Sequence, residues 1–76
     1  MEMEKLRLAN IQMFDARAEE PMVDVWHDLP TDHTVLMSEL RLVLELMNER
    51  VGLTRLRVSW PDNFFNPIVL EKSPTP

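Results

Sequence analysis

The chain contains no cysteine and no tyrosine, and it has one glycine among 76 residues. Without cysteine it has neither disulfide bonds nor thiolate metal sites. No segment approaches the ~20 apolar residues that a membrane-spanning helix needs. The first four residues carry two glutamates and no base, which is the wrong charge for a signal peptide. We therefore expect a cytoplasmic protein with no membrane association.

A chain of 76 residues has room for one domain. A domain of this size buries only about 60% of the surface that its unfolded chain exposes, so its stability is marginal. Association with another subunit is the remaining way to add buried area when disulfides are excluded. We expect one domain over residues 1–72 and a disordered tail at residues 73–76, where serine, threonine and two prolines have little to pack.

Acidic residues concentrate in the middle of the chain. Residues 15–49 contain nine acids and two bases, a net charge of −7, whereas residues 50–76 contain four bases and two acids, a net charge of +2. Because the acidic segment repels phosphate, we expect no direct nucleic-acid binding. A basic protein surface would be attracted to it. The partner-binding acids that we predict are Glu19, Glu20, Asp24, Asp28, Glu45 and Glu49.

The stretch from Asp32 to Val51 predicts one long amphipathic helix. Thr31 or Asp32 can cap its start, and Gly52 can adopt the left-handed conformation that ends a helix. At about 100° per residue the main apolar positions form one stripe, and the polar positions gather on the far side. The stripe contains Leu36, Leu40, Val43 and Met47, with Met37, Leu44 and Val51 beside it, and the polar side contains Ser38, Arg41, Glu45, Asn48 and Glu49.

A second apolar row makes the helix apolar over more than half of its circumference. This arc is wider than the ~100° stripe of an ordinary surface helix. A sheet would cover one part of the arc, and in so short a chain a second subunit is a candidate cover for the rest. The dimer interface that we predict consists of Val35, Leu42, Leu46 and Leu53.

Four shorter segments predict strands. The first alternates apolar and polar residues but slips at Ala9–Asn10, which indicates a bulge, and a helix is the alternative there. The first two segments should form a hairpin, followed by a turn over residues 29–32. The pattern predicts an α+β domain of order ββαββ: a small antiparallel sheet with one long amphipathic helix packed on one face. The strands are predicted at residues 4–14, 22–26, 54–60 and 67–71.

Two groups of polar residues have a spacing that could support chemistry. His27, Asp28, Asp32 and His33 could bind zinc or manganese, but we favour the interpretation that Asp32 caps the helix, Asp28 supports the turn and the histidines lie at the surface. Two arginines on one strand face could bind a phosphate or carboxylate, but we favour pairing with Glu71, Asp24 or another acid of that face. The arginines are Arg55 and Arg57.

Large apolar side chains gather around a predicted turn at residues 61–63. We favour the interpretation that they seal the end of the sheet, and the alternative is an exposed binding surface of the kind that forms interface hot spots. The residues are Trp60, Phe64 and Phe65, joined by Trp26 and Met22.

The sequence predicts a protein-binding module without catalysis that docks on a basic surface of a partner. It contains no nucleophile elbow, cysteine nucleophile or phosphate loop, so we expect neither an enzyme nor a cofactor. In size and acidity the chain resembles the small inhibitors that phages and mobile elements encode against host machinery, anti-CRISPR proteins among them. That resemblance includes no motif and implies no functional residue. The alternatives are a homodimeric structural or assembly subunit and a small metal-dependent protein.

Overall fold

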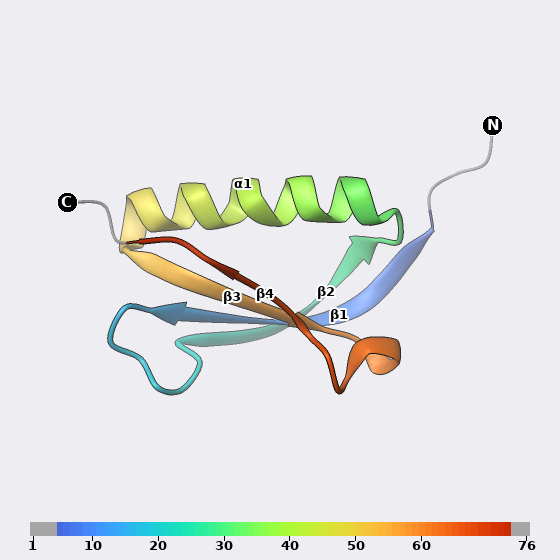
Figure 1. The fold of residues 1–76 in the computed structure, drawn as a ribbon, viewed down its shortest axis with the longest axis horizontal. Coiled ribbons are helices and arrows are strands. Elements are labelled where there is room, and N and C mark those ends of the chain that lie inside the picture. The colour runs from blue at the N-terminus through green and yellow to red at the C-terminus, as the bar shows by residue number, and fades with distance from the viewer. Residues whose placement is uncertain (1–4, 74–76) are drawn as a thin grey trace.

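The computed structural model describes residues 5–73 as a four-stranded antiparallel sheet with one helix along one face (Figure 1). The strands lie side by side in the order β2-β1-β3-β4. This arrangement confirms the predicted α+β fold and the element order ββαββ. The elements are β1 (Leu6–Asp15), β2 (Val23–Pro30), α1 (His33–Val51), β3 (Leu53–Ser59), the short 3-10 helix η1 (Pro61–Asn63) and β4 (Ile68–Glu71).

The strand β1 confirms the extended interpretation of this segment, but the bulge predicted at Ala9–Asn10 is wrong. The pairing of β1 with β2 has no register shift, and the shift in its pairing with β3 lies at Phe14–Asp15. Alternation is therefore unbroken across Ala9–Asn10. Ile11 is buried on the inner face, which lies toward α1, whereas Leu6 and Leu8 lie exposed on the outer face. The sequence pattern slips because apolar residues occupy both faces of one regular strand.

The second strand is longer than predicted. β2 continues in extended form through Pro30, which pairs with Leu6, so the turn into α1 begins only at Thr31. Leu29 is buried beneath α1, and this burial holds the end of β2 against the core. Proline is tolerated here because β2 is an edge strand.

Both predicted ends of the helix are confirmed. The carboxylate of Asp32 accepts a hydrogen bond from the backbone N–H of Val35 at 3.0 Å. Gly52 has a φ of 74°, and its N–H bonds the carbonyl oxygens of Asn48 and Met47. A residue with a Cβ would be strained at this φ, so the single glycine is placed where the backbone requires it.

The buried side of α1 is rotated relative to the prediction. Leu36, Leu40 and Leu44 are buried, but Val43 is 38% exposed. Asn48, predicted on the solvent side, is only 3% exposed. Its Nδ2 donates to the carbonyl oxygen of Leu53 at 2.8 Å and lies 3.4 Å from that of Ser73. The buried side-chain amide is tolerated here because it donates hydrogen bonds to backbone carbonyl oxygens.

The core lies between α1 and the inner face of the sheet. α1 packs mainly on β3, where the inward-facing Leu56 and Val58 both have 0% exposure. The predicted inner and outer faces of β3 are thereby confirmed. The remaining buried members of this cluster are Ala9, Ile11, Leu29, Leu36, Leu40, Leu44 and Leu53.

Substituting Leu40 or Leu42 with aspartate should have opposite consequences for the fold. Leu40→Asp places an unpaired charge in the core and should unfold the domain, since deletion of a buried leucine alone costs about 2–5 kcal/mol. Leu42→Asp changes a side chain that is 67% exposed, so the domain should remain folded. Urea unfolding followed by circular dichroism measures both. Unfolding of the Leu42 variant would show that this side chain belongs to the core.

Truncating the buried Asn48 should lower stability more than truncating an exposed polar residue of the same helix. Asn48→Ala leaves the buried carbonyl oxygen of Leu53 without this donor, which should cost about 1–3 kcal/mol. The control is Glu49→Ala, which changes the next residue of the helix, where the side chain is exposed. It should change the unfolding free energy by less than about 0.5 kcal/mol. Equal midpoints in urea for the two variants would contradict a structural role for the amide.

Candidate protein-binding surfaces

The structure distributes the six predicted partner-binding acids over three places. Asp24 and Asp28 lie on the outer face of β2, because the intervening odd-numbered positions share the inner face with buried Leu29. The two glutamates at positions 45 and 49 lie on α1, on the opposite side of the sheet, and those at positions 19 and 20 lie in the loop between β1 and β2. All six are exposed. They do not form one continuous acidic patch.

The side chain of Asp24 is engaged within the chain. Its two carboxylate oxygens accept hydrogen bonds from the side-chain amides of Asn10 and Gln12. Gln12 in turn accepts a hydrogen bond from Arg57 at 3.3 Å. This chain of contacts crosses three neighbouring strands and fixes the outer face, so Asp24 contributes to the sheet and is less available to a partner.

The solvent side of α1 carries an apolar row between acidic residues. Leu42 lies roughly 160° around the helix axis from both Leu40 and Leu44, so it points away from the sheet. It is 67% exposed, whereas Leu46 is 44% and Val35 is 36% exposed. We call this surface the acidic ridge. It consists of Val35, Leu42 and Leu46 together with Glu39, Glu45 and Glu49.

The acidic ridge keeps most of its negative charge. Over residues 5–73, the one ion pair is between Lys72 Nζ and Glu45 Oε1, at 3.7 Å with both side chains largely exposed. An exposed pair of this kind contributes little to stability and is screened by salt. Glu39 and Glu49 are exposed as well. The ridge can therefore attract a basic surface.

One member of the predicted dimer interface does not belong there. Leu53 has 0% exposure and packs in the core of its own chain. It follows Gly52, which reverses the chain direction and directs β3 beneath the helix. The other three residues, Val35, Leu42 and Leu46, remain accessible on the ridge.

The two arginines of β3 cover an aromatic ring. The guanidinium carbon of Arg55 lies 4.0 Å from the ring centroid of Phe14, and that of Arg57 lies 5.3 Å from it. Phe14 is only 1% exposed although it lies on the outer face of the sheet. These distances fit cation–π contacts. The predicted direct ion pairs with Glu71 and Asp24 are not formed, because the guanidinium groups pack on the ring.

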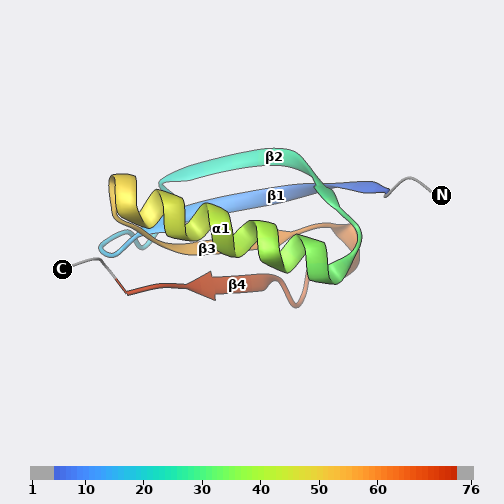
Figure 2. The same ribbon diagram turned by 90° about the horizontal axis from the view of Figure 1, so that it is seen from above.

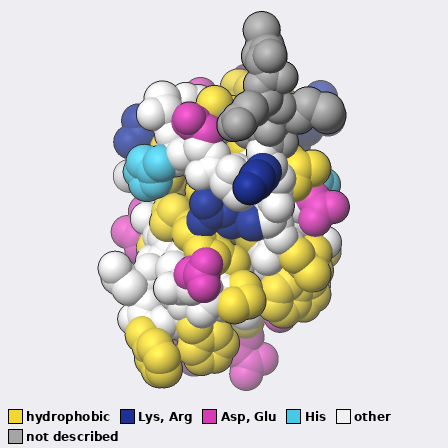
Figure 3. Space-filling model, turned by 90° about the vertical axis from the view of Figure 1, so that its right-hand side faces the viewer, with side chains coloured by type: hydrophobic (Ala, Val, Ile, Leu, Met, Phe, Trp, Pro, Cys, Tyr) yellow, Lys and Arg dark blue, Asp and Glu magenta, His cyan; other side chains and the backbone are white. Residues whose placement is uncertain are grey.

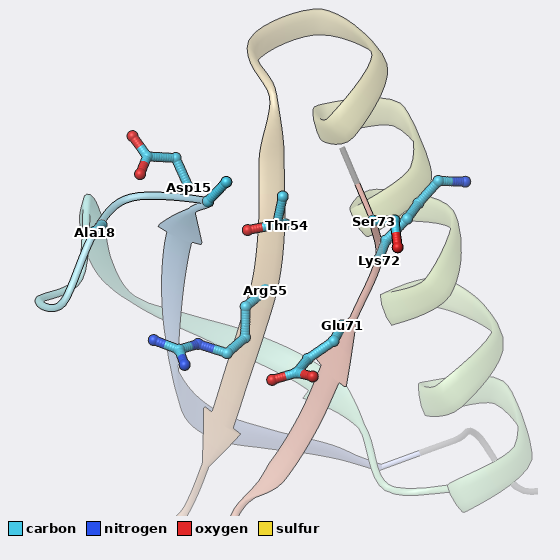
Figure 4. Close-up of a pocket in the computed structure, with 8 residues that line it drawn as sticks. Asp15, Ala18, Thr54, Arg55, Glu71, Lys72 and Ser73 are labelled. Atoms are coloured by element: carbon cyan, nitrogen blue, oxygen red, sulfur yellow. The ribbon is translucent and has the colours of Figure 1, made fainter. Parts of the chain in front are cut away.

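A hollow of about 380 Å³ lies beside Arg55, at the end of the sheet where β1, β3 and β4 approach one another (Figure 4). Arg55 and Glu71 extend along the same side of the sheet, whereas Lys72 points toward α1. The charged side chains of the lining are two acids and two bases, and the lining contains no histidine. This balance gives the hollow no preference for a strongly charged ligand. The lining residues are Asp15, Ala16, Ala18, Thr54, Arg55, Glu71, Lys72 and Ser73.

The aromatic residues divide into a packed ring and an exposed pair. Trp60 packs against the core and is covered by Arg7, whose guanidinium carbon lies 4.2 Å from the ring centroid. Phe64 and Phe65 contact each other edge to face but are 70% and 98% exposed. The prediction that the aromatic residues pack at the end of the sheet is therefore confirmed for Trp60 and wrong for Phe64 and Phe65. Figure 3 shows apolar side chains gathered at the lower part of this end of the molecule.

Trp26 and Met22, the other residues expected to join this group, are also exposed, at 62% and 45%. Trp26 lies on the outer face of β2, opposite Asn10. Met22 precedes the strand, and its N–H donates to the carbonyl oxygen of Met13. Neither side chain contributes to the buried core.

The histidines and aspartates around the start of α1 are not gathered into one site. β2 is extended, so His27 and Asp28 project to opposite faces of the sheet. The Nδ1 atom of His27 lies 2.8 Å from the carbonyl oxygen of Asp28. Asp32 caps α1, and His33 is the first helical residue. Within residues 5–73, no three His, Cys, Asp or Glu side chains are arranged to hold a metal ion.

The predicted tail at residues 73–76 lies mostly outside the described residues, and only Ser73 of it is placed. In the described part of the chain, no helix is both long enough and apolar enough to cross a membrane. No family model, curated protein or solved structure matches the chain.

Proposed function

We propose that the chain is a protein-binding module without catalysis, which docks through the acidic ridge of α1 on a partner that offers a basic surface. The observation that carries this proposal is the position of Leu42, which points into solvent at 67% exposure in a row of apolar side chains between glutamates. A soluble helix normally places polar residues there. An apolar residue at that position supports a contact outside the chain.

The spacing of the apolar residues on the ridge suits a helix that docks one of its sides on a partner. Val35, Leu42 and Leu46 are separated by seven and four residues, so they lie along one side of α1 and can enter an apolar strip on a partner. The neighbouring glutamates would steer a basic partner toward this strip and increase the association rate. A partner whose basic surface normally binds nucleic acid would be blocked by such a contact. The proposed role is therefore that of an inhibitor or modulator of the type that phages and mobile elements encode.

The same ridge is less suited to a homodimer interface. Two copies that meet ridge to ridge would bring Glu39, Glu45 and Glu49 of one chain close to the same residues of the other. Like charges in close contact oppose association. A basic partner would neutralise these glutamates, so charge favours a different protein over a second copy at this surface.

The test compares two double variants with the same net charge. Glu45→Lys with Glu49→Lys alters the ridge, and Glu19→Lys with Glu20→Lys alters the β1–β2 loop; each change adds four charges and brings the net charge from −5 to −1. A partner is first isolated with the wild-type chain from the cells that produce it, and its dissociation constant is then measured with purified proteins. The ridge variant should bind about tenfold more weakly, and the loop variant should bind nearly as well as wild type.

Ionic strength provides a second measurement. Wild-type affinity should fall between low and high salt, mainly through a slower association rate. Equal affinities of the two double variants, an affinity that does not depend on salt, or failure to isolate a basic partner would each contradict the proposal. Thermal unfolding of both variants controls for a loss of structure.

A further inference from the structure

One edge of the sheet is long and unpaired. β2 has eight residues, and in the described part of the chain it pairs only with β1. The other edge, β4, has four residues and follows Pro67, which limits its extension. Short strands, prolines and charged side chains are usual protections of a sheet edge. β2 has Pro30 at its very end and the aspartates Asp24 and Asp28 on its outer face. β2 is therefore the edge that is open to another strand.

The hydrogen-bonding groups of β2 alternate in direction. The N–H of Thr31 bonds the carbonyl oxygen of Lys5, and the two residues occupy the pairing register of β1 with β2. Because bonded and non-bonded pairs alternate along an antiparallel ladder, the odd-numbered residues of β2 bond β1. The backbone groups of Asp24, Trp26 and Asp28 then point outward from the edge, and of these the Asp28 carbonyl oxygen is contacted by His27 Nδ1 at 2.8 Å.

This edge exposes apolar side chains on both faces, although Trp26 on the outer face lies between Asp24 and Asp28. Val23 and Val25 lie on the inner face and are 39% and 36% exposed. They remain uncovered because α1 packs over β3, and β2 lies to one side of it when the molecule is seen from above (Figure 2). On the outer face Trp26 is 62% exposed. β2 contains no lysine, the charged side chain used most often against edge-to-edge association, and its charged side chains are Asp24 and Asp28.

We propose that β2 pairs with β2 of a second copy of this chain, antiparallel and around a two-fold axis through the pair of Val25 residues. In this register Trp26 lies opposite Asp24 of the other copy, and His27 lies opposite Val23. The next symmetric register, centred on Trp26, would place Asp24 directly opposite Asp28. Like charges directly opposite each other destabilise a strand pair. Charge therefore favours the register centred on Val25 over the one centred on Trp26.

The paired strands would join two sheets into one continuous sheet of eight strands. A two-fold axis perpendicular to the sheet keeps both α1 helices on the same face. The acidic ridge is not used in this contact, because it lies on the solvent side of α1. The dimer is therefore independent of the proposed function, and each can fail without the other.

The experiment measures molar mass by sedimentation equilibrium for wild type and two matched variants of the full chain. Val25→Lys places a charge at the two-fold axis, and Val69→Lys introduces the same change on β4, where Val69 is 46% exposed. Wild type and the β4 variant should be dimers, and Val25→Lys should raise the dimer dissociation constant by roughly 100-fold or more. A monomeric wild type, or a dimer that Val25→Lys leaves intact, would overturn the proposal.

Amide hydrogen exchange of the wild type addresses the case in which a variant fails to fold. The N–H of Trp26 points outward in the monomer, so its exchange should slow as protein concentration increases. Exchange that is independent of concentration would contradict pairing through this edge. Asp24 and Asp28 of opposite copies are diagonal neighbours in the favoured register, so dimerisation should strengthen with added salt. Binding to a basic partner through the ridge should respond in the opposite direction.

Discussion

The dominant constraint on this molecule is that a single helix must cover a four-stranded sheet. An α-helix with its side chains is about 10–12 Å across, and strands lie about 4.8 Å apart, so one helix covers little more than two strands. Here α1 is seated on β3 by Leu36, Leu40 and Leu44, against Leu56 and Val58. β2, two strands away, is left with exposed valines on the face that would otherwise be core. The open edge of the sheet follows from this geometry.

Arginine side chains compensate for the missing second layer on the outer face. Arg55 and Arg57 lie over Phe14, and on the inner side Arg7 lies over Trp60. Long charged side chains can cover apolar rings in this way while their charged ends reach water. The consequence is electrostatic as well as structural. Because these three arginines contact aromatic rings and not carboxylates, Glu45 is the one acid of residues 5–73 that forms an ion pair, and the other carboxylates there keep their charge without a basic partner.

Local signals in the sequence are sufficient for the order of elements and for the faces of β3, but not for the buried faces of α1 and β1. The caps at Asp32 and Gly52 act within a few residues of the chain, so the helix boundaries could be predicted. The burial of Asn48 depends on which strand lies under α1 and on backbone carbonyls that are brought there by the fold. In β1, apolar residues occupy the outer face at Leu6 and Leu8 and the inner face at Ile11 and Met13. This change of face looks like a bulge in the sequence, although the strand is regular there. Phe65 is exposed because it lies in the connection between η1 and β4, and no apolar periodicity in the sequence indicates the path of that connection.

If both contacts form, dimerisation through β2 would strengthen partner binding through the acidic ridge of α1. Joining two sheets through β2 places two acidic ridges on one face of a continuous sheet, with their orientations related by the two-fold axis. A partner that presents two basic strips would then be held by both, and the second contact would form at the high effective concentration of a tethered site. A single ridge with only three apolar side chains would bind weakly on its own. Symmetric pairing is therefore a physical route by which a 76-residue chain with a small core could hold a partner firmly.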